Sequence, residues 1–341
     1  MRTKTSKPLA WLSSLPQLLD IATPVVVILM TVILVTERTP KREPFLYAVV
    51  LAALIALTWA SARSRSDYGL WALYIGGFAI FSVARSFADE TGVPTHFDDI
   101  IRADRALAFG AVPTVWLQSH FFDPTHISWL DRATTYVHWS YFVLPHLFAA
   151  HLFFGKRHLF ERYVLLFVGV LMAGLVIYFV FPAAPPWAAS LTGHLDPTYK
   201  VVTEVGSEWN VNLYAKLESQ IRSSNPVAAM PSLHMAVSFA VLLMAFRANW
   251  LLGILAVAYN AAMAFSLVYL GEHYAVDILA GIGMTVTVYI ALSLWFRFRE
   301  RVPGLSAAPV PVPMPVPVAA AAPQVQPQSA SQAGYSGSAP D

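Results

Sequence analysis

The chain has 341 residues, of which 57% are hydrophobic and 12% are charged, with a formal net charge of +2. A soluble domain carries about 25% charged residues, so a deficit over the whole chain indicates a membrane protein. The absence of cysteine excludes disulfides, thiolate catalysis and cysteine-ligated metals. The small net charge argues against a nucleic-acid partner.

Eight apolar stretches are long enough to cross a bilayer, which takes about 17–25 residues per helix. They lie at about 17–36, 45–62, 70–88, 134–154, 160–182, 233–249, 251–270 and 274–298. The first stretch follows a basic N-terminus without a small-residue cleavage site, so we interpret it as a retained anchor. The predicted fold class is an all-α polytopic transmembrane bundle of about eight helices.

Three regions differ in composition. Two long hydrophilic connections, 89–133 and 183–232, interrupt the apolar stretches. From about Val302 onward the chain consists mainly of Pro, Ala, Val, Gln and Ser, a composition that cannot form a packed core. We therefore predict N-terminal transmembrane helices over 1–90, a membrane domain over 91–300 and a disordered Pro/Ala-rich tail over 303–341.

The charge distribution predicts the orientation in the membrane. If the N-terminus is cytoplasmic, the inner segments hold 12 of the 22 basic residues and five of the 20 acidic ones. Basic residues in short loops set orientation, although a basic group at 38–42 falls in a short outer loop. We therefore expect a multi-pass cell-membrane protein with the 183–232 connection and the 271–273 turn on the extracytoplasmic side.

One candidate site segment is Met230-Pro231-Ser232-Leu233-His234, which directly precedes an apolar run. Proline just inside a helix start, with serine beside it, indicates a helix N-terminus. The unpaired N–H groups and positive dipole end of such a helix suit a phosphate. We expect His234 in the first turn, at the membrane surface.

A second candidate segment runs from Ser266 to Asp277 and includes His273. On a helix, His273 and Asp277 would share one face, and the aspartate could accept from one imidazole nitrogen and leave the other nucleophilic. The helix that begins at His234 runs inward and the next returns outward, so both histidines are expected at one membrane surface. Phosphoryl transfer requires such a nucleophile and acid.

Other interpretations of these histidines remain open. A lone histidine at a helix end is more often a hydrogen-bonded interfacial residue, and a transporter or membrane scaffold could use such a pair to carry protons. Two histidines and one aspartate are also a minimal zinc set. Because ionisable groups at membrane depth are costly, two on one face favour a functional site. We predict an enzyme site with no metal and no cofactor.

Asp98, Asp99 and Asp104 form an acidic group in the first long connection. Carboxylates together with substrate phosphates could bind magnesium. The apolar residues between them favour a short interfacial helix with an acidic face instead.

The two candidate segments resemble motifs of the type-2 phosphatidic acid phosphatase superfamily. Pro231-Ser232-x-His234 resembles the second motif, and His273-x-x-x-Asp277, with Ser266 seven residues upstream, resembles the third. The resemblance covers roughly 95–298 and implies a six-helix phosphatase-like catalytic core. It implies a mechanism without a metal, in which His273 attacks phosphorus, Asp277 orients His273 and His234 protonates the leaving alkoxide. Ser232 and Ser266 are the corresponding substrate-binding residues.

The chain departs from the phosphatase branch of that superfamily, which has a Lys-x6-Arg-Pro first motif and an arginine after the serine of the third. Here Leu267 occupies that arginine position, and the segment 178–187 has no basic residue. This segment and the stretch 104–118 instead resemble the branch of inositol phosphorylceramide synthase and sphingomyelin synthase. That branch implies headgroup transfer from a phospholipid or polyprenyl phosphate in the bilayer; the alternative is a lipid-phosphate phosphatase.

A phosphate still needs positive charge around it. The candidates are Arg85 near a helix end, Arg222 before the second motif and His138, followed by Lys216 and His194. For Arg222 and Lys216 a solvated loop face is the favoured alternative. A singly charged diester needs fewer cations than a monoester dianion, which agrees with the transferase branch.

Overall fold

A computed structural model describes residues 52, 55, 56, 58, 66–85, 87, 88, 92–208 and 227–301. Within these residues the regular structure is helical, apart from isolated β-bridges, which confirms the all-α prediction. The helices are α3 (Asp67–Arg85), α4 (Asp98–Leu107), α5 (Pro113–Phe121), α6 (Trp129–Ser140), α7 (Leu144–Gly155), α8 (Arg157–Val180), α9 (Pro186–Leu191), α10 (Val201–Glu208), α12 (Leu233–Ala248), α13 (Trp250–Tyr269) and α14 (Ala275–Arg301).

Several predictions fall outside the described residues. They include the first predicted span at 17–36, most of the second, Arg222, Lys216 and the tail at 303–341. The domain boundaries near residues 90 and 300 therefore stay predictions.

Four of the described helices are long and apolar enough to cross a membrane, namely α3, α8, α13 and α14, and the apolar helices α7 and α12 are shorter. Large apolar side chains project outward from these helices, including Val176, Val180, Leu255 and Leu294. An exposed apolar surface of this kind is unfavourable in water and favourable against lipid tails. The chain is a multi-pass membrane protein.

The prediction of one continuous helix over 134–154 is wrong, because this stretch forms two helices. α6 ends at Ser140, and α7 begins at Leu144 with a proline in its first turn. Pro145 has no N–H to donate and its ring would clash with the carbonyl four residues earlier, so it favours the break that separates the two helices. The other predicted spans from residue 70 onward agree with the observed helices within three residues.

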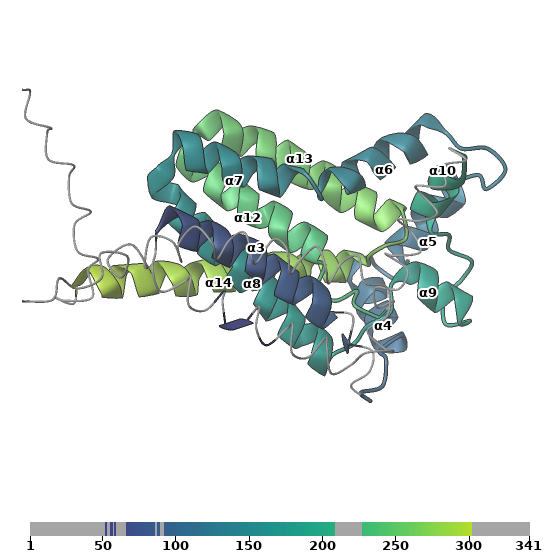
Figure 1. Cartoon of the computed structure of the whole chain (residues 1–341). Coiled ribbons are helices and arrows are strands. Elements are labelled where there is room, and N and C mark those ends of the chain that lie inside the picture. Colours follow the sequence, from purple (N-terminus) through teal and green to yellow (C-terminus); the bar gives the residue numbers. More distant parts are fainter. Residues whose placement is uncertain are drawn as a thin grey trace, which may run out of the picture. The chain divides into compact units, whose positions relative to one another are not determined.

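α12 lies at the centre of the bundle and packs against α13, α8 and α7 (Figure 1). Small residues such as Ala236 and Ala240 are fully buried on it, so the neighbouring helices approach closely. In the middle of the bundle the Asn260 amide of α13 donates to the Ser238 carbonyl of α12 at 3.1 Å. These contacts fix the position of the N-terminal end of α12, where His234 lies.

The two long connections are not structureless, because they contain α4, α5, α9 and α10. Figure 1 shows these helices gathered at one end of the long helices. Gln118 of α5 joins two other segments there, since its amide donates to the carbonyls of Tyr199 and Tyr269 at 2.9 and 2.8 Å. The Tyr199 N–H donates back to the Gln118 side chain at 2.8 Å. The connections are thus tied to the end of α13.

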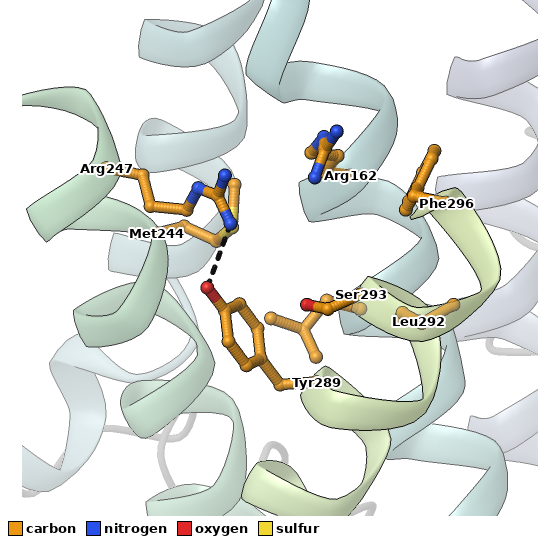
Figure 2. Close-up of a pocket in the computed structure, with 8 residues that line it drawn as sticks. Arg162, Met244, Arg247, Tyr289, Leu292, Ser293 and Phe296 are labelled. Carbon is orange, nitrogen blue, oxygen red and sulfur yellow. Dashed lines mark hydrogen bonds between the residues drawn. The ribbon is translucent and has the colours of Figure 1, made fainter. Parts of the chain in front are cut away.

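A small hollow lies at the other end of α12, between α8, α12 and α14 (Figure 2). Arg162 and Arg247 line it, and Arg247 donates to the Tyr289 hydroxyl at 2.9 Å. Arg247 lies 13 positions after His234 on the same helix, which corresponds to about 20 Å. The hollow is therefore distinct from the histidine site, at the end that the charge distribution predicts to be inner.

Candidate active site

His234 is presented by the start of α12. Ser232 is the N-cap, and its hydroxyl accepts the Met235 N–H at 3.3 Å, which satisfies one free donor of the first turn. The helix begins at Leu233, so Pro231 precedes the cap and does not lie inside the helix as expected. The Tyr178 hydroxyl donates to the Pro231 carbonyl at 3.0 Å and holds this segment against α8.

His273 lies in the turn between α13 and α14, so the expectation that His273 and Asp277 share one helix face is wrong. The turn requires Gly271, whose φ is 76° and whose added Cβ would lie 2.5 Å from the Tyr199 carbonyl oxygen. Asp277, the third residue of α14, accepts the Tyr274 N–H at 2.9 Å. This bond directs the carboxylate back toward His273, and Oδ2 lies 3.6 Å from His273 Nδ1.

Backbone contacts bring the two histidine segments together. The Ser232 N–H donates to the Asp277 carbonyl at 3.0 Å, and the Thr285 hydroxyl donates to the Ala236 carbonyl at 3.0 Å. α14 approaches α12 closely at Gly281, where an added Cβ would lie 2.4 Å from the Ser232 carbonyl oxygen. As a result, His234 Nδ1 lies 3.2 Å from His273 Nε2.

Gly281→Ala is expected to destabilise the protein by about 1–3 kcal/mol, because the methyl group would meet backbone that cannot move aside. Gly283 is the matched control on the same helix, since nothing lies within 4 Å of its added Cβ. Gly283→Ala should be neutral or slightly stabilising. Thermal unfolding of the two variants in detergent measures the difference; equal melting temperatures would contradict the close approach.

The centre of this site contains buried polar atoms. His273 is 5%, His138 7% and Asp277 0% exposed. Among the described residues, His273 Nδ1, Asp277 Oδ1 and both ring nitrogens of His138 have no hydrogen-bond partner. The His138 ring lies 4.8 Å from the His234 ring, centroid to centroid. Because unpartnered buried polar atoms are rare, their concentration here favours a site for a polar ligand.

Two cations lie near the histidines. Arg85 ends α3 and interacts electrostatically with His234 and Tyr141. Lys200 interacts electrostatically with His234 and His138, lies 3.8 Å from the Glu272 carboxylate and stands 5.0 Å from the Trp187 ring centroid. Sequence reasoning missed Lys200, because nothing in its spacing separates it from the other basic residues of the long connections.

The remaining predicted residues are placed as follows. Ser266 lies in the last turn of α13 and is 1% exposed. His194 is hydrogen-bonded to the exposed Asp98 at 3.1 Å. Arg222 is outside the described residues.

The predicted acidic face of α4 is wrong for one of its three residues. Asp98 and Asp99 are exposed, whereas Asp104 is 0% exposed. Asp104 Oδ1 accepts the Val276 N–H of α14 at 3.0 Å. The free donors at the start of α14 attract this carboxylate into the protein.

The fold and site together define an integral-membrane helix bundle with a partly buried histidine pair at one end. Residues 98–291 match the family model described as the PAP2 superfamily. Because this match spans more than half of the chain, the chain belongs to that superfamily, as its motifs predicted.

The curated relatives support the predicted branch. The chain is 26% identical over 274 residues to the phosphoinositol dihydroceramide synthase of Bacteroides thetaiotaomicron. The aligned region covers 71% of this chain and 88% of that relative. The chain is 28% identical over 166 residues to the inositol phosphorylceramide synthase of Candida albicans. This aligned region covers 46% of the chain and 33% of that relative. The chain is 32% identical over 114 residues to the inositol phosphorylceramide synthase catalytic subunit AUR1 of Saccharomyces cerevisiae, 32% of this chain and 28% of the relative. No solved structure matches the chain significantly.

Proposed function

We propose that this protein is an integral-membrane phosphotransferase that moves a phosphoryl headgroup from a phospholipid to a lipid hydroxyl through a phosphohistidine on His273. The observation that carries the proposal is the 3.2 Å separation of His234 Nδ1 and His273 Nε2, with Asp277 3.6 Å from the other nitrogen of His273. The names of the relatives support inositol phosphate as the headgroup and a ceramide-like alcohol as the acceptor.

In the first step, the lone pair of His273 Nε2 attacks phosphorus and the bond to the diacylglycerol oxygen breaks. Asp277 lies 3.6 Å from Nδ1, so its charge favours the tautomer with the proton on Nδ1, leaves Nε2 unprotonated and stabilises the positive charge that develops on the ring. His234, next to the reacting nitrogen, gives its proton to the leaving alkoxide, which departs as diacylglycerol.

In the second step, the acceptor hydroxyl attacks the same phosphorus and the P–N bond breaks. His234 now takes the hydroxyl proton, so its protonation state is restored and His273 is released as the free base. Water could complete the same step, and the outcome would then be hydrolysis. The buried position of His273 and Asp277 reduces access of water and favours transfer.

The negative charge of the phosphodiester needs cations, and we propose that Arg85 and Lys200 supply them. Arg85→Gln and Lys200→Gln are each expected to lower kcat/KM by about 10²-fold. Arg102, an exposed α4 cation paired with Asp99, is the matched control, and Arg102→Gln should keep wild-type activity. Steady-state kinetics on folded variants check this; wild-type kcat/KM in both Arg85 and Lys200 variants would exclude these residues.

Product analysis tests the proposed function. Purified enzyme is given phosphatidylinositol with and without a ceramide acceptor. Transfer predicts diacylglycerol and inositol phosphorylceramide in equal amounts when the acceptor is present. Hydrolysis would instead release diacylglycerol and water-soluble inositol phosphate, whatever acceptor is offered, and a transporter would move lipid across sealed vesicles without cleaving it. Activity in the presence of a chelator is expected, because no step uses a metal.

We further infer that the site faces the extracytoplasmic side of the cell membrane. Arg162 and Arg247 lie toward the opposite end of the bundle, where the positive-inside rule places basic residues in the cytoplasm. The cysteine-free chain permits a direct test with single cysteines at Thr192, directly after α9, and at Asn249, directly after α12. Labelling of intact cells by an impermeant maleimide should modify Thr192→Cys and not Asn249→Cys; the reverse pattern would overturn the orientation.

A further inference from the structure

The helix that follows His273 begins without a capping side chain at the residue that precedes it. Tyr274 precedes the first residue of α14 and has no short side-chain oxygen that could accept the free N–H groups of the first turn. Two carboxylates replace it. Asp277 accepts the Tyr274 N–H at 2.9 Å, and Asp104 of α4, 172 residues earlier in the chain, accepts the Val276 N–H at 3.0 Å.

Asp104 is an unfavourable residue for stability alone. It is 0% exposed, and its Oδ2 has no hydrogen-bond partner among the described residues. Burial, with a smaller contribution from the charge of Asp277, raises the pKa of Asp104 to about 6, while the Val276 N–H partly opposes this rise. An asparagine could accept the same N–H without burying a charge. We therefore expect the asparagine variant to be at least as stable as wild type, and a residue that lowers stability at its own position favours a functional role.

The sign of the pH effect follows from the raised pKa. A group that binds its proton more tightly in the folded state stabilises the fold most below its ordinary pKa of 3.8 and loses that contribution as the pH rises to about 6. Wild-type stability should therefore fall between these pH values relative to Asp104→Asn. Above about pH 6 the difference in stability between wild type and Asp104→Asn should be constant.

The charge of Asp104 lies near the carboxylate that faces the reacting histidine. Asp104, Asp277 and Tyr274 interact electrostatically with one another, and each has a buried oxygen without a hydrogen-bond partner among the described residues. His273 adjoins this cluster, through Asp277 on one side and the peptide bond to Tyr274 on the other. When Nε2 of His273 bonds to phosphorus, its ring becomes cationic, and a second negative charge nearby stabilises that cation.

We propose that Asp104 is a positioning residue for the reaction: it holds the first turn of α14, so that Asp277 and His273 keep their geometry, and its charge stabilises the phosphorylated imidazole. This inference rests on the proposed role of His273. Asp104 does not touch the substrate in this account, so it should affect kcat and leave KM nearly unchanged.

Asp104→Asn is the informative variant, because it keeps an acceptor for the Val276 N–H and removes the charge. Asp99→Asn, on the exposed side of the same helix, is the matched control. We expect Asp104→Asn to lower kcat and the rate of labelling of His273 at least tenfold, with KM within about twofold of wild type. Its melting temperature at pH 7.5 should equal or exceed that of wild type, and the gain should shrink toward pH 4.

The outcomes separate this inference from the proposed function. Labelling of His273 at the wild-type rate in Asp104→Asn would overturn the inference and leave the proposed function intact. A kcat loss that follows a lower melting temperature at pH 7.5 would also overturn it, because the residue would then be structural. A wild-type enzyme that turns over without labelling His273 would instead overturn the proposed function, and this inference with it.

Discussion

His273→Ala is expected to lower turnover by about 10⁴-fold or more, because no other group is placed to form the covalent intermediate. The residue is 5% exposed and lies in a turn fixed by Gly271 and Asp277, so the variant should retain the fold. Both steps of the reaction pass through Nε2, and neither a better leaving group nor a stronger acceptor should restore the rate. Initial rates of diacylglycerol release, with melting temperatures measured in parallel, check this result.

His194→Ala is the control for the loss of an imidazole at the same end of the bundle. His194 is bonded to exposed Asp98 and lies outside the proposed reaction. It should keep most of the wild-type rate. If His273→Ala turned over phosphatidylinositol as fast as His194→Ala, the nucleophile would have to be another group.

His234→Ala is expected to lower turnover of a natural phospholipid by about 10²–10⁴-fold, the usual contribution of a general acid or base. The physical reason is the leaving group, since a diacylglycerol alkoxide is a strong base that must be protonated as it departs. His138, whose ring lies beside that of His234, is the matched control. His138→Ala should cost less, because in this account it transfers no proton.

An activated substrate separates proton transfer from other effects of this substitution. A nitrophenyl ester of inositol phosphate releases nitrophenolate, which needs no proton at neutral pH. The burst of nitrophenolate in the first turnover should therefore fall by less than about tenfold in His234→Ala. An equal loss on the activated and natural substrates would show that His234 does not act as the acid.

Most of the bundle could be predicted from hydropathy, because an apolar helix that crosses the bilayer must be long enough to match its thickness. The exception shows the limit of that signal. Residues 134–154 are apolar enough to form one span, but Pro145 interrupts the backbone hydrogen bonds and divides the stretch into α6 and α7. The position of this one proline therefore sets a helix boundary that the average hydropathy of residues 134–154 does not show.

The histidine pair could also be predicted, because a helical hairpin returns the chain to the membrane surface from which it started. Its detailed geometry could not. The sequence predicts His273 and Asp277 on one helix, whereas the structure joins them through a turn and the Tyr274 N–H. The spacing of four residues correctly predicted that Asp277 lies close to His273, but the two residues do not share a helix face.

The surroundings of the pair depend on contacts between distant segments. Asp104 lies 172 residues from Val276 in the chain. It begins the stretch 104–118 that resembles the synthase branch, but nothing in that stretch indicates its contact with α14. Lys200 is equally inconspicuous in the sequence, although in the structure it interacts electrostatically with His234. Residues held by tertiary contacts of this kind are those that sequence patterns describe least well.

The covalent intermediate is the central claim, and its detection on His273 tests that claim most directly. The enzyme is mixed with phosphatidylinositol without an acceptor and quenched in denaturant at alkaline pH, where a phosphorus–imidazole bond survives. Peptide mass spectrometry should find inositol phosphate on His273, formed at least as fast as turnover and lost when ceramide is added. An adduct on another residue, or rapid turnover with no adduct on His273, would contradict the account.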